Sequence, residues 1–284
     1  REIFSENDLL SVGIESFEYK IKNLEDFQKM KKLYLSKKEE VLNVCEKERE
    51  YAAKYYKSLE LEEKKCLFFD CGWNGSSQYL LENILEKKQF KIDSEFYYTG
   101  IFDNEKSRKQ LANRKHDAYL FDIGKNQDFV SRIKDSIIIL ELFFGAPHGS
   151  ILKYDKNGAV LEKIEDDFEY KKSIFEGILD YVKFALPIFE DMNITVTEND
   201  IMNSIIRLIE RPTLEEAIGI GNLKNLDGFA YQKDEVKYIG YLTPEQLKKN
   251  KNIEIYWYHG VLKRNDIDES VKIFIKNKFN LNSE

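Results

Sequence analysis

Apolar residues recur at three- and four-residue intervals through the first 60 residues. The pattern covers Leu24 to Leu33 and again Lys37 to Leu59, with lysine and glutamate at most of the remaining positions. This spacing is typical of amphipathic helices that bury one face and keep the charged face in water. The sequence therefore predicts a helical lead-in over residues 1–60.

Short apolar runs follow and alternate with helical stretches. The run Cys66 to Phe69 predicts a buried strand that ends at Asp70, and two further strands are predicted at Phe96–Phe102 and Ala118–Ile123. Because strands that alternate with helices favour a parallel sheet, we expect an α/β fold. Its core would be a Rossmann-like parallel sheet, flanked by additional N- and C-terminal helices.

The remaining elements complete the expected organisation. Either Ser76 or Ser77 is expected to cap a helix that runs to about Lys88. Further helices are predicted at residues 126–144, 168–189, 198–209 and 269–279, and Asp155–Gly158 predicts a hairpin turn between strands at 150–154 and 159–164. We expect a lead-in over residues 1–60 packed on an α/β core at 61–165 that carries a ligand loop. Residues 166–284 form the mainly helical C-terminal part of the same unit.

Composition narrows the class of protein. The chain has 284 residues, of which 42% are hydrophobic and 13% aromatic, which excludes a disordered chain. It carries 44 basic and 51 acidic residues, a net charge of −7, so we expect no nucleic-acid partner. No run of about 18 apolar residues is present, and no membrane span is expected.

The cysteines and the first residue add two expectations. Cys45, Cys66 and Cys71 are too few for a disulfide framework, and the last two lack the further ligands of a zinc site. Reduced thiols indicate a cytoplasmic protein. The sequence begins with Arg1 rather than methionine, which suggests a fragment with a domain upstream.

The segment Asp70–Gln78 reads DCGWNGSSQ and follows a predicted strand. Ligands of open α/β sheets bind outside the carboxyl ends of the strands, and helix N-termini favour phosphate. The predicted ligand-binding residues are Gly72, Trp73, Asn74, Gly75, Ser76, Ser77 and Gln78, with Asp103 and Gly149 from later loops. The structural alternative is that the serines only cap the helix, the glycines only turn the chain and Trp73 belongs to the core.

Three side chains are candidates for acid–base catalysis. Asp70 ends a predicted strand, Glu141 lies in an otherwise apolar stretch, and His148 sits in a glycine-containing loop. A carboxylate among apolar residues must be paired, protonated or facing a site, and histidine titrates near neutral pH. We expect these three residues to form a catalytic constellation, with a buried hydrogen bond as the alternative for Glu141.

The strand–Asp-x-Gly-Trp-x-Gly-Ser-x-Gln–helix motif at Asp70–Gln78 resembles one in the C-terminal region of large bacterial proteins. Those proteins are predicted haloacid-dehalogenase-superfamily hydrolases, found with glycosyltransferases in surface-polysaccharide clusters. Weaker similarities lie in residues 48–56, 141–150 and 212–229 and at Trp257 with Gly260, so the resemblance spans roughly residues 38–262. It implies a role in surface-polysaccharide synthesis.

One departure limits what the resemblance implies. Dehalogenase-type phosphatases carry a second aspartate two residues after the nucleophile, whereas Asp70 is followed by Cys71 and Gly72. Phosphatase chemistry is therefore not encoded in this chain. Two expectations stay open. One is a phosphosugar- or nucleotide-sugar-binding domain, with or without glycosyl or phosphoryl transfer. The other is a non-catalytic docking or structural module of a hydrolase whose catalytic domain lies upstream, or a partner of a glycosyltransferase.

Overall fold

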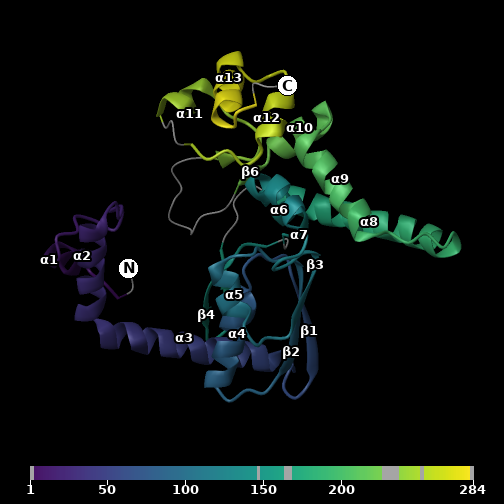
Figure 1. The fold of residues 1–284 in the computed structure, drawn as a ribbon. Coiled ribbons are helices and arrows are strands. Elements are labelled where there is room, and N and C mark those ends of the chain that lie inside the picture. The colour runs from purple at the N-terminus through teal and green to yellow at the C-terminus, as the bar shows by residue number, and fades with distance from the viewer. Residues whose placement is uncertain (1–2, 146–147, 163–167, 226–236, 250–252, 282–284) are drawn as a thin grey trace. The chain divides into compact units, whose positions relative to one another are not determined.

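The computed structural model describes residues 3–145, 148–162, 168–225, 237–249 and 253–281 (Figure 1). The contacts divide the chain into two compact units. The first unit comprises Arg1–Lys64, Asn83–Ile92 and Ile151–Leu161, and the second comprises Lys65–Glu82, Asp93–Ser150 and Glu162–Glu284. Each unit has its own packing and is described separately.

The first unit is built on helices and one hairpin. Its elements are α1 (Glu6–Ser11), α2 (Leu24–Ser36), α3 (Lys38–Ser58) and the antiparallel strands β4 (Ile151–Asp155) and β5 (Gly158–Leu161). Leu9, Ile14 and Leu33 form a small core between α1 and α2. The hairpin packs on α3, where the hydroxyls of Tyr56 and Tyr154 lie 3.1 Å apart. The predicted lead-in helices and the hairpin turn are confirmed; residues 163–164 of the predicted second strand lie outside the described part.

The second unit contains a three-stranded parallel sheet in the order β1-β2-β3. The strands are β1 (Lys65–Asp70), β2 (Asp93–Gly100) and β3 (His116–Phe121), connected by α4 (Ser76–Lys87) and α5 (Glu105–Leu111). The parallel sheet and the mixed α/β class are confirmed. α4 lies on the face that carries Phe96 and Tyr98, because the Tyr98 hydroxyl donates to the Gln78 amide oxygen over 3.2 Å.

The strand predicted at Cys66–Phe69 is present, but the prediction that it is buried is wrong for the face that carries Leu67 and Phe69. Leu67 is 71% exposed and Phe69 is 61% exposed. β1 lies at the edge of the sheet, and its Phe68 stacks with Phe96 on the other face. The sequence is apolar at consecutive positions because both faces of this strand carry apolar side chains, and one of these faces is exposed to solvent.

The rest of the second unit is mainly helical. It comprises α6 (Gln127–Ile133), a 3-10 turn (Lys134–Ser136), α7 (Ile138–Phe144), α8 (Phe168–Asp191), α9 (Glu198–Glu210), α10 (Leu214–Gly221), β6 (Lys224–Asn225), β7 (Lys237–Tyr238), α11 (Pro244–Lys249), α12 (Tyr258–Lys263) and α13 (Glu269–Lys278). The expected single helix at 126–144 is wrong, because the polar stretch Lys134–Ser136 breaks it into α6 and α7. The short helices α5, α11 and α12 are not predicted from the sequence. None of the described helices combines the length and apolar character that a bilayer crossing requires.

The main core of this unit joins the sheet to the helices. Phe121 from β3, Ile139 from α7 and Ile209 from α9 are fully or almost fully buried in one cluster. Trp257 is completely buried in the same cluster, and its indole N–H donates to the Ile209 carbonyl over 2.8 Å. The cluster therefore connects the helices after β3 with the end of the chain.

Core packing makes a direct prediction about stability. Ile139→Ala should lower the free energy of unfolding by about 2–5 kcal/mol, because it removes a fully buried side chain from the cluster. Leu80→Ala on the exposed side of α4 is the matched control and should change it by about 0.5 kcal/mol or less. Denaturant unfolding followed by circular dichroism measures both, and equal losses would contradict this core.

Candidate functional site

The segment Asp70–Gln78 connects the carboxyl end of β1 to the first turn of α4. Its course is fixed by backbone contacts with the next strand. The Phe102 N–H donates to the Trp73 carbonyl over 2.8 Å, and the Asn104 amide donates to the Asn74 side-chain oxygen over 2.9 Å. The segment is thus held against residues 100–104 at the carboxyl edge of the sheet, the place that the sequence predicted.

Two glycines make this close approach possible. Gly72 has φ of +135°, and a Cβ there would collide with the carbonyl oxygen of Gly100. Gly75 has φ of +71°, and a Cβ there would collide with the Leu111 side chain. Both positions need glycine for conformation and for space. The turn itself therefore explains why glycine occupies both positions, without a ligand.

Trp73 belongs to the protein core. Its indole is only 8% exposed and stacks on Phe121 with ring centroids 5.7 Å apart and planes 7° apart. The indole N–H donates to Glu141 Oε1 over 2.6 Å. The predicted ligand-binding role of Trp73 does not fit this position, because the ring is enclosed by the protein and belongs to the core, as the structural alternative had it. Glu141 has the buried hydrogen bond that the sequence left as its alternative role.

Asp70 and Glu141 both lie near the Cys71 thiol. Burial raises the pKa of Cys71 to about 12, and the carboxylates of Glu141 and then Asp70 add to that shift because negative charge disfavours the thiolate. The Asp70 carboxylate also accepts a hydrogen bond from the Gly72 N–H over 3.1 Å. Two of the three expected catalytic residues are therefore brought to one end of β1.

The third member, His148, lies in the loop after α7. Its ring is exposed, and Nδ1 lies 2.9 Å from the Gly149 carbonyl oxygen. Gly149 is buried where a Cβ would collide with the Glu162 carbonyl oxygen, which explains this glycine by close backbone packing. Ala146 and Pro147, part of the segment that resembles the family, lie outside the described residues.

The helix start differs in detail from the expectation. α4 begins at Ser76, whose hydroxyl donates to the Gln110 side-chain oxygen over 3.0 Å rather than capping the helix. The first backbone bond of the helix runs from the Tyr79 N–H to the Gly75 carbonyl. The N–H groups of residues 76–78 therefore precede the helical hydrogen-bond ladder. Ser77 is exposed beside them.

The two remaining polar candidates have structural partners. The buried Gln78 amide donates to Glu82 over 2.9 Å and to the Lys115 carbonyl over 3.1 Å, so this side chain connects α4 to the sheet. Asp103 forms a two-pronged ion pair with Arg108, with donor–acceptor distances of 2.7 and 2.8 Å. These contacts explain the positions of the Gln78 amide and the Asp103 carboxylate without a ligand.

Sequence reasoning missed Asn104 and Gln110, which hold the loop from α5. Their side chains meet Asn74 and Ser76 only after β2 and α5 have packed. A short polar residue before a helix is a cap signal, and Asn104 does cap α5 by accepting the Ser107 N–H over 3.0 Å. Among the residues that the structure describes, no group of three or more His, Cys, Asp or Glu is arranged to hold a metal ion.

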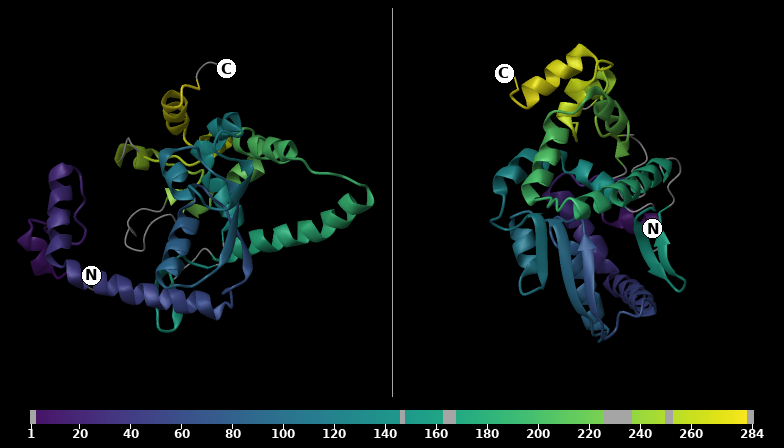
Figure 2. Two further views of the ribbon diagram at one scale, coloured as in Figure 1. Left: turned by 60° about the horizontal axis from the view of Figure 1, so that its bottom comes forward. Right: turned by 90° about the vertical axis from the view of Figure 1, so that its right-hand side faces the viewer.

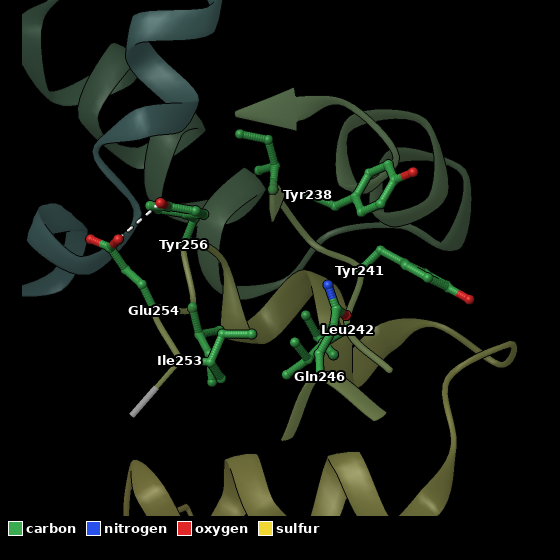
Figure 3. Close-up of a pocket in the computed structure, with 10 residues that line it drawn as sticks. Tyr238, Tyr241, Leu242, Gln246, Ile253, Glu254 and Tyr256 are labelled. Carbon is green, nitrogen blue, oxygen red and sulfur yellow. Dashed lines mark hydrogen bonds between the residues drawn. The ribbon is translucent and has the colours of Figure 1, made fainter. Parts of the chain in front are cut away.

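A separate pocket lies in residues 238–261 and includes none of the loop residues (Figure 3). Tyr256 donates to Glu254 over 2.9 Å on one side, while the hydroxyls of Tyr238 and Tyr241 point away from them on the other. The pocket offers about 20 Å³ to water, which is room for about one molecule. It is too small for a sugar in this conformation.

No protein-family model, curated protein or solved structure matches the chain. The interpretation of the site therefore depends on its own geometry and on the sequence resemblance described above.

The Trp73–Glu141 hydrogen bond predicts a graded loss of stability. Trp73→Phe keeps an aromatic ring against Phe121 but removes the N–H donor, and should lower the free energy of unfolding by about 1–3 kcal/mol. Glu141→Gln retains an acceptor oxygen and should lower it by less. Chemical denaturation of both variants measures the difference, and an equal or reversed order would contradict a structural role for this bond.

The three cysteines should differ in reactivity. At pH 8 the Cys71 thiol should remain protonated and react at least tenfold more slowly with iodoacetamide than the exposed Cys45, because its pKa lies near 12. Mass spectrometry of tryptic peptides measures the rate at each site, and denatured protein provides the control in which the rates converge. Rapid modification of Cys71 in folded protein would show that its surroundings are open and polar.

Proposed function

We propose that the chain is a sugar-phosphate- or nucleotide-sugar-binding domain of bacterial surface-polysaccharide biosynthesis, with the β1-β2-β3 sheet as a Rossmann-like core. One observation carries the proposal: the carboxyl end of β1 passes through a glycine turn into α4, whose exposed Ser77 lies in the first turn, before the helical hydrogen-bond ladder begins at Tyr79. The partial positive charge of the helix start favours phosphate there.

The neighbouring groups suit the sugar portion of such a ligand. Asp70 uses one carboxylate oxygen to accept the Gly72 N–H, so its other oxygen can accept a sugar hydroxyl. Asn74 is half-buried at the same edge, fixed by Asn104. If the domain also catalyses glycosyl or phosphoryl transfer, Asp70 is the general base in this proposal, because it ends β1 at the loop and Glu141 is engaged with Trp73.

A second candidate function is supported by an apolar stripe on α2 in the first unit. Leu33 of this helix is buried in the small core, whereas Leu24, Phe27, Tyr34 and Leu35 are 74%, 55%, 50% and 59% exposed. Exposed apolar surface of this kind marks interaction sites. The alternative proposal is a non-catalytic module that docks through α2 on the upstream haloacid-dehalogenase-type domain implied by the sequence resemblance.

The binding proposal is tested by a thermal-shift screen with inorganic phosphate, glucose 1-phosphate and UDP-glucose. A ligand present at about 100 times its dissociation constant stabilises the folded state by about 2.7 kcal/mol, a shift of several degrees. Ser77→Asp should abolish that shift by repelling the anion, yet should leave the unliganded protein as stable or slightly more stable, since a carboxylate favours a helix start.

Two further variants complete this test. Asp70→Asn should weaken binding of the sugar phosphates more than binding of inorganic phosphate, because it alters the predicted hydroxyl contact. Gln28→Glu adds the same charge to exposed α2 and should leave binding unchanged. Absence of a shift with all three ligands would reject the binding proposal and favour the docking module; a shift that survives Ser77→Asp would place the ligand elsewhere.

A further inference from the structure

The middle of α8 is rich in apolar side chains that are exposed to solvent. Five of its exposed apolar side chains recur at intervals of one helical turn and form a stripe: Phe175, Ile178, Leu179, Val182 and Leu186, which are 48%, 38%, 41%, 46% and 51% exposed. Tyr181 and Phe184 are also exposed, on other sides of the helix. Figures 1 and 2 show α8 extending away from the strands, with the connection to α9 returning from its far end. A helix with such a stripe normally buries it against another layer.

The same unit contains a sheet face that is exposed over β1. The register places Leu67 beside Glu95, Phe69 beside Tyr97, and Tyr97 beside Asp117, so these residues share one face. Leu67 and Phe69 are 71% and 61% exposed, as noted above. Parallel sheets are normally covered on both faces, because each strand carries apolar residues on both sides. This open face and the α8 stripe are therefore complementary in character.

α7 and α9, the helices of this unit that precede and follow α8, lie at the two sides of this face. Phe144 at the end of α7 lies with its ring centroid 6.0 Å from that of Phe69. Glu198 at the start of α9 accepts a hydrogen bond from Lys125, which also donates to the Tyr119 carbonyl of β3, both over 3.0 Å. α7 is thus near β1 and α9 near β3.

We propose that α8 closes onto the open face of its own sheet, with the stripe Phe175–Leu186 covering Leu67 and Phe69. The dimensions agree: the stripe is roughly 17 Å long and β1 roughly 20 Å. The N-terminal end of α8 is already held, since it contacts α7 and Tyr170 packs on the main core. The six residues 192–197 can span up to roughly 20 Å, which lets the far end swing while α9 stays in place.

Closure within one chain is favoured over exchange with a second copy because α7 and α9 already lie at the two sides of the face. The effective concentration of a tethered helix is of millimolar order, far above the concentration of a second chain in dilute solution. The closed state is a three-layer arrangement with helices on both sides of the sheet. This inference does not depend on the proposed ligand.

A pair of engineered cysteines tests the contact. In a chain whose three native cysteines are replaced by alanine, Leu67→Cys is combined with Val182→Cys on the stripe. The matched control combines Leu67→Cys with Asp180→Cys, which lies on the opposite side of α8 and is also exposed. Mild oxidation of the first pair should give a disulfide within one chain at least tenfold faster than in the control, read by mass spectrometry and non-reducing electrophoresis.

Each outcome decides the question. A disulfide between two chains in the stripe pair would overturn closure within one chain and show exchange between copies. Equal rates for both pairs, or no disulfide in either, would overturn docking of the stripe. Circular dichroism establishes beforehand that both cysteine-pair proteins have the helix content of the parent chain.

A second measurement, thermal unfolding, keeps the three native cysteines in place and needs only single substitutions. Val182→Asp should lower the midpoint of thermal unfolding by about 5 °C or more if the stripe is buried in the closed state. Asp180→Ala, on the opposite side, should leave it nearly unchanged. Equal midpoints for Val182→Asp and the parent chain would mean that the stripe stays in water, and would overturn the proposal.

Discussion

The packing of Trp73 is the interaction on which the rest of the second unit depends. The Trp73 side chain extends from the loop after β1, and its ring stacks on Phe121 of β3. Its indole N–H donates to Glu141 of α7, so this one side chain connects three parts of the chain. Its carbonyl also accepts the Phe102 N–H after β2. The loop, the sheet and the following helices are therefore fixed together, and the start of α4 is presented at the carboxyl edge with a defined geometry.

This arrangement separates two roles that the sequence places side by side. Within the segment Asp70–Gln78, Trp73 and Gln78 are buried and stabilise the fold, and both glycines are required by the turn. Ser77 remains exposed at the helix start. A ligand would thus be held mainly by backbone and hydroxyl groups, which suits an anion better than it suits acid–base chemistry, since Glu141 is engaged with Trp73.

The second constraint is the uncovered half of the sheet. α4 satisfies one face, while Leu67 and Phe69 project from the other and the stripe of α8 lies in water. Apolar surface exposed on two complementary elements of one unit costs free energy that closure would recover. Since α7 carries both Glu141 and the Phe144 that touches this face, the covering layer and the loop share a supporting helix.

The sequence by itself determined the local elements, because periodicity and turn residues act over a few positions. It located the helices at 24–36, 38–58 and 76–87, the three strands, and the loop after Asp70 at the sheet edge. It did not separate core from site within that loop, since Trp73 meets Phe121 and Glu141 from 48 and 68 residues away. Nor did it show that Leu67 is exposed. Only the tertiary structure decided these points, because burial and convergence depend on which distant segments pack together.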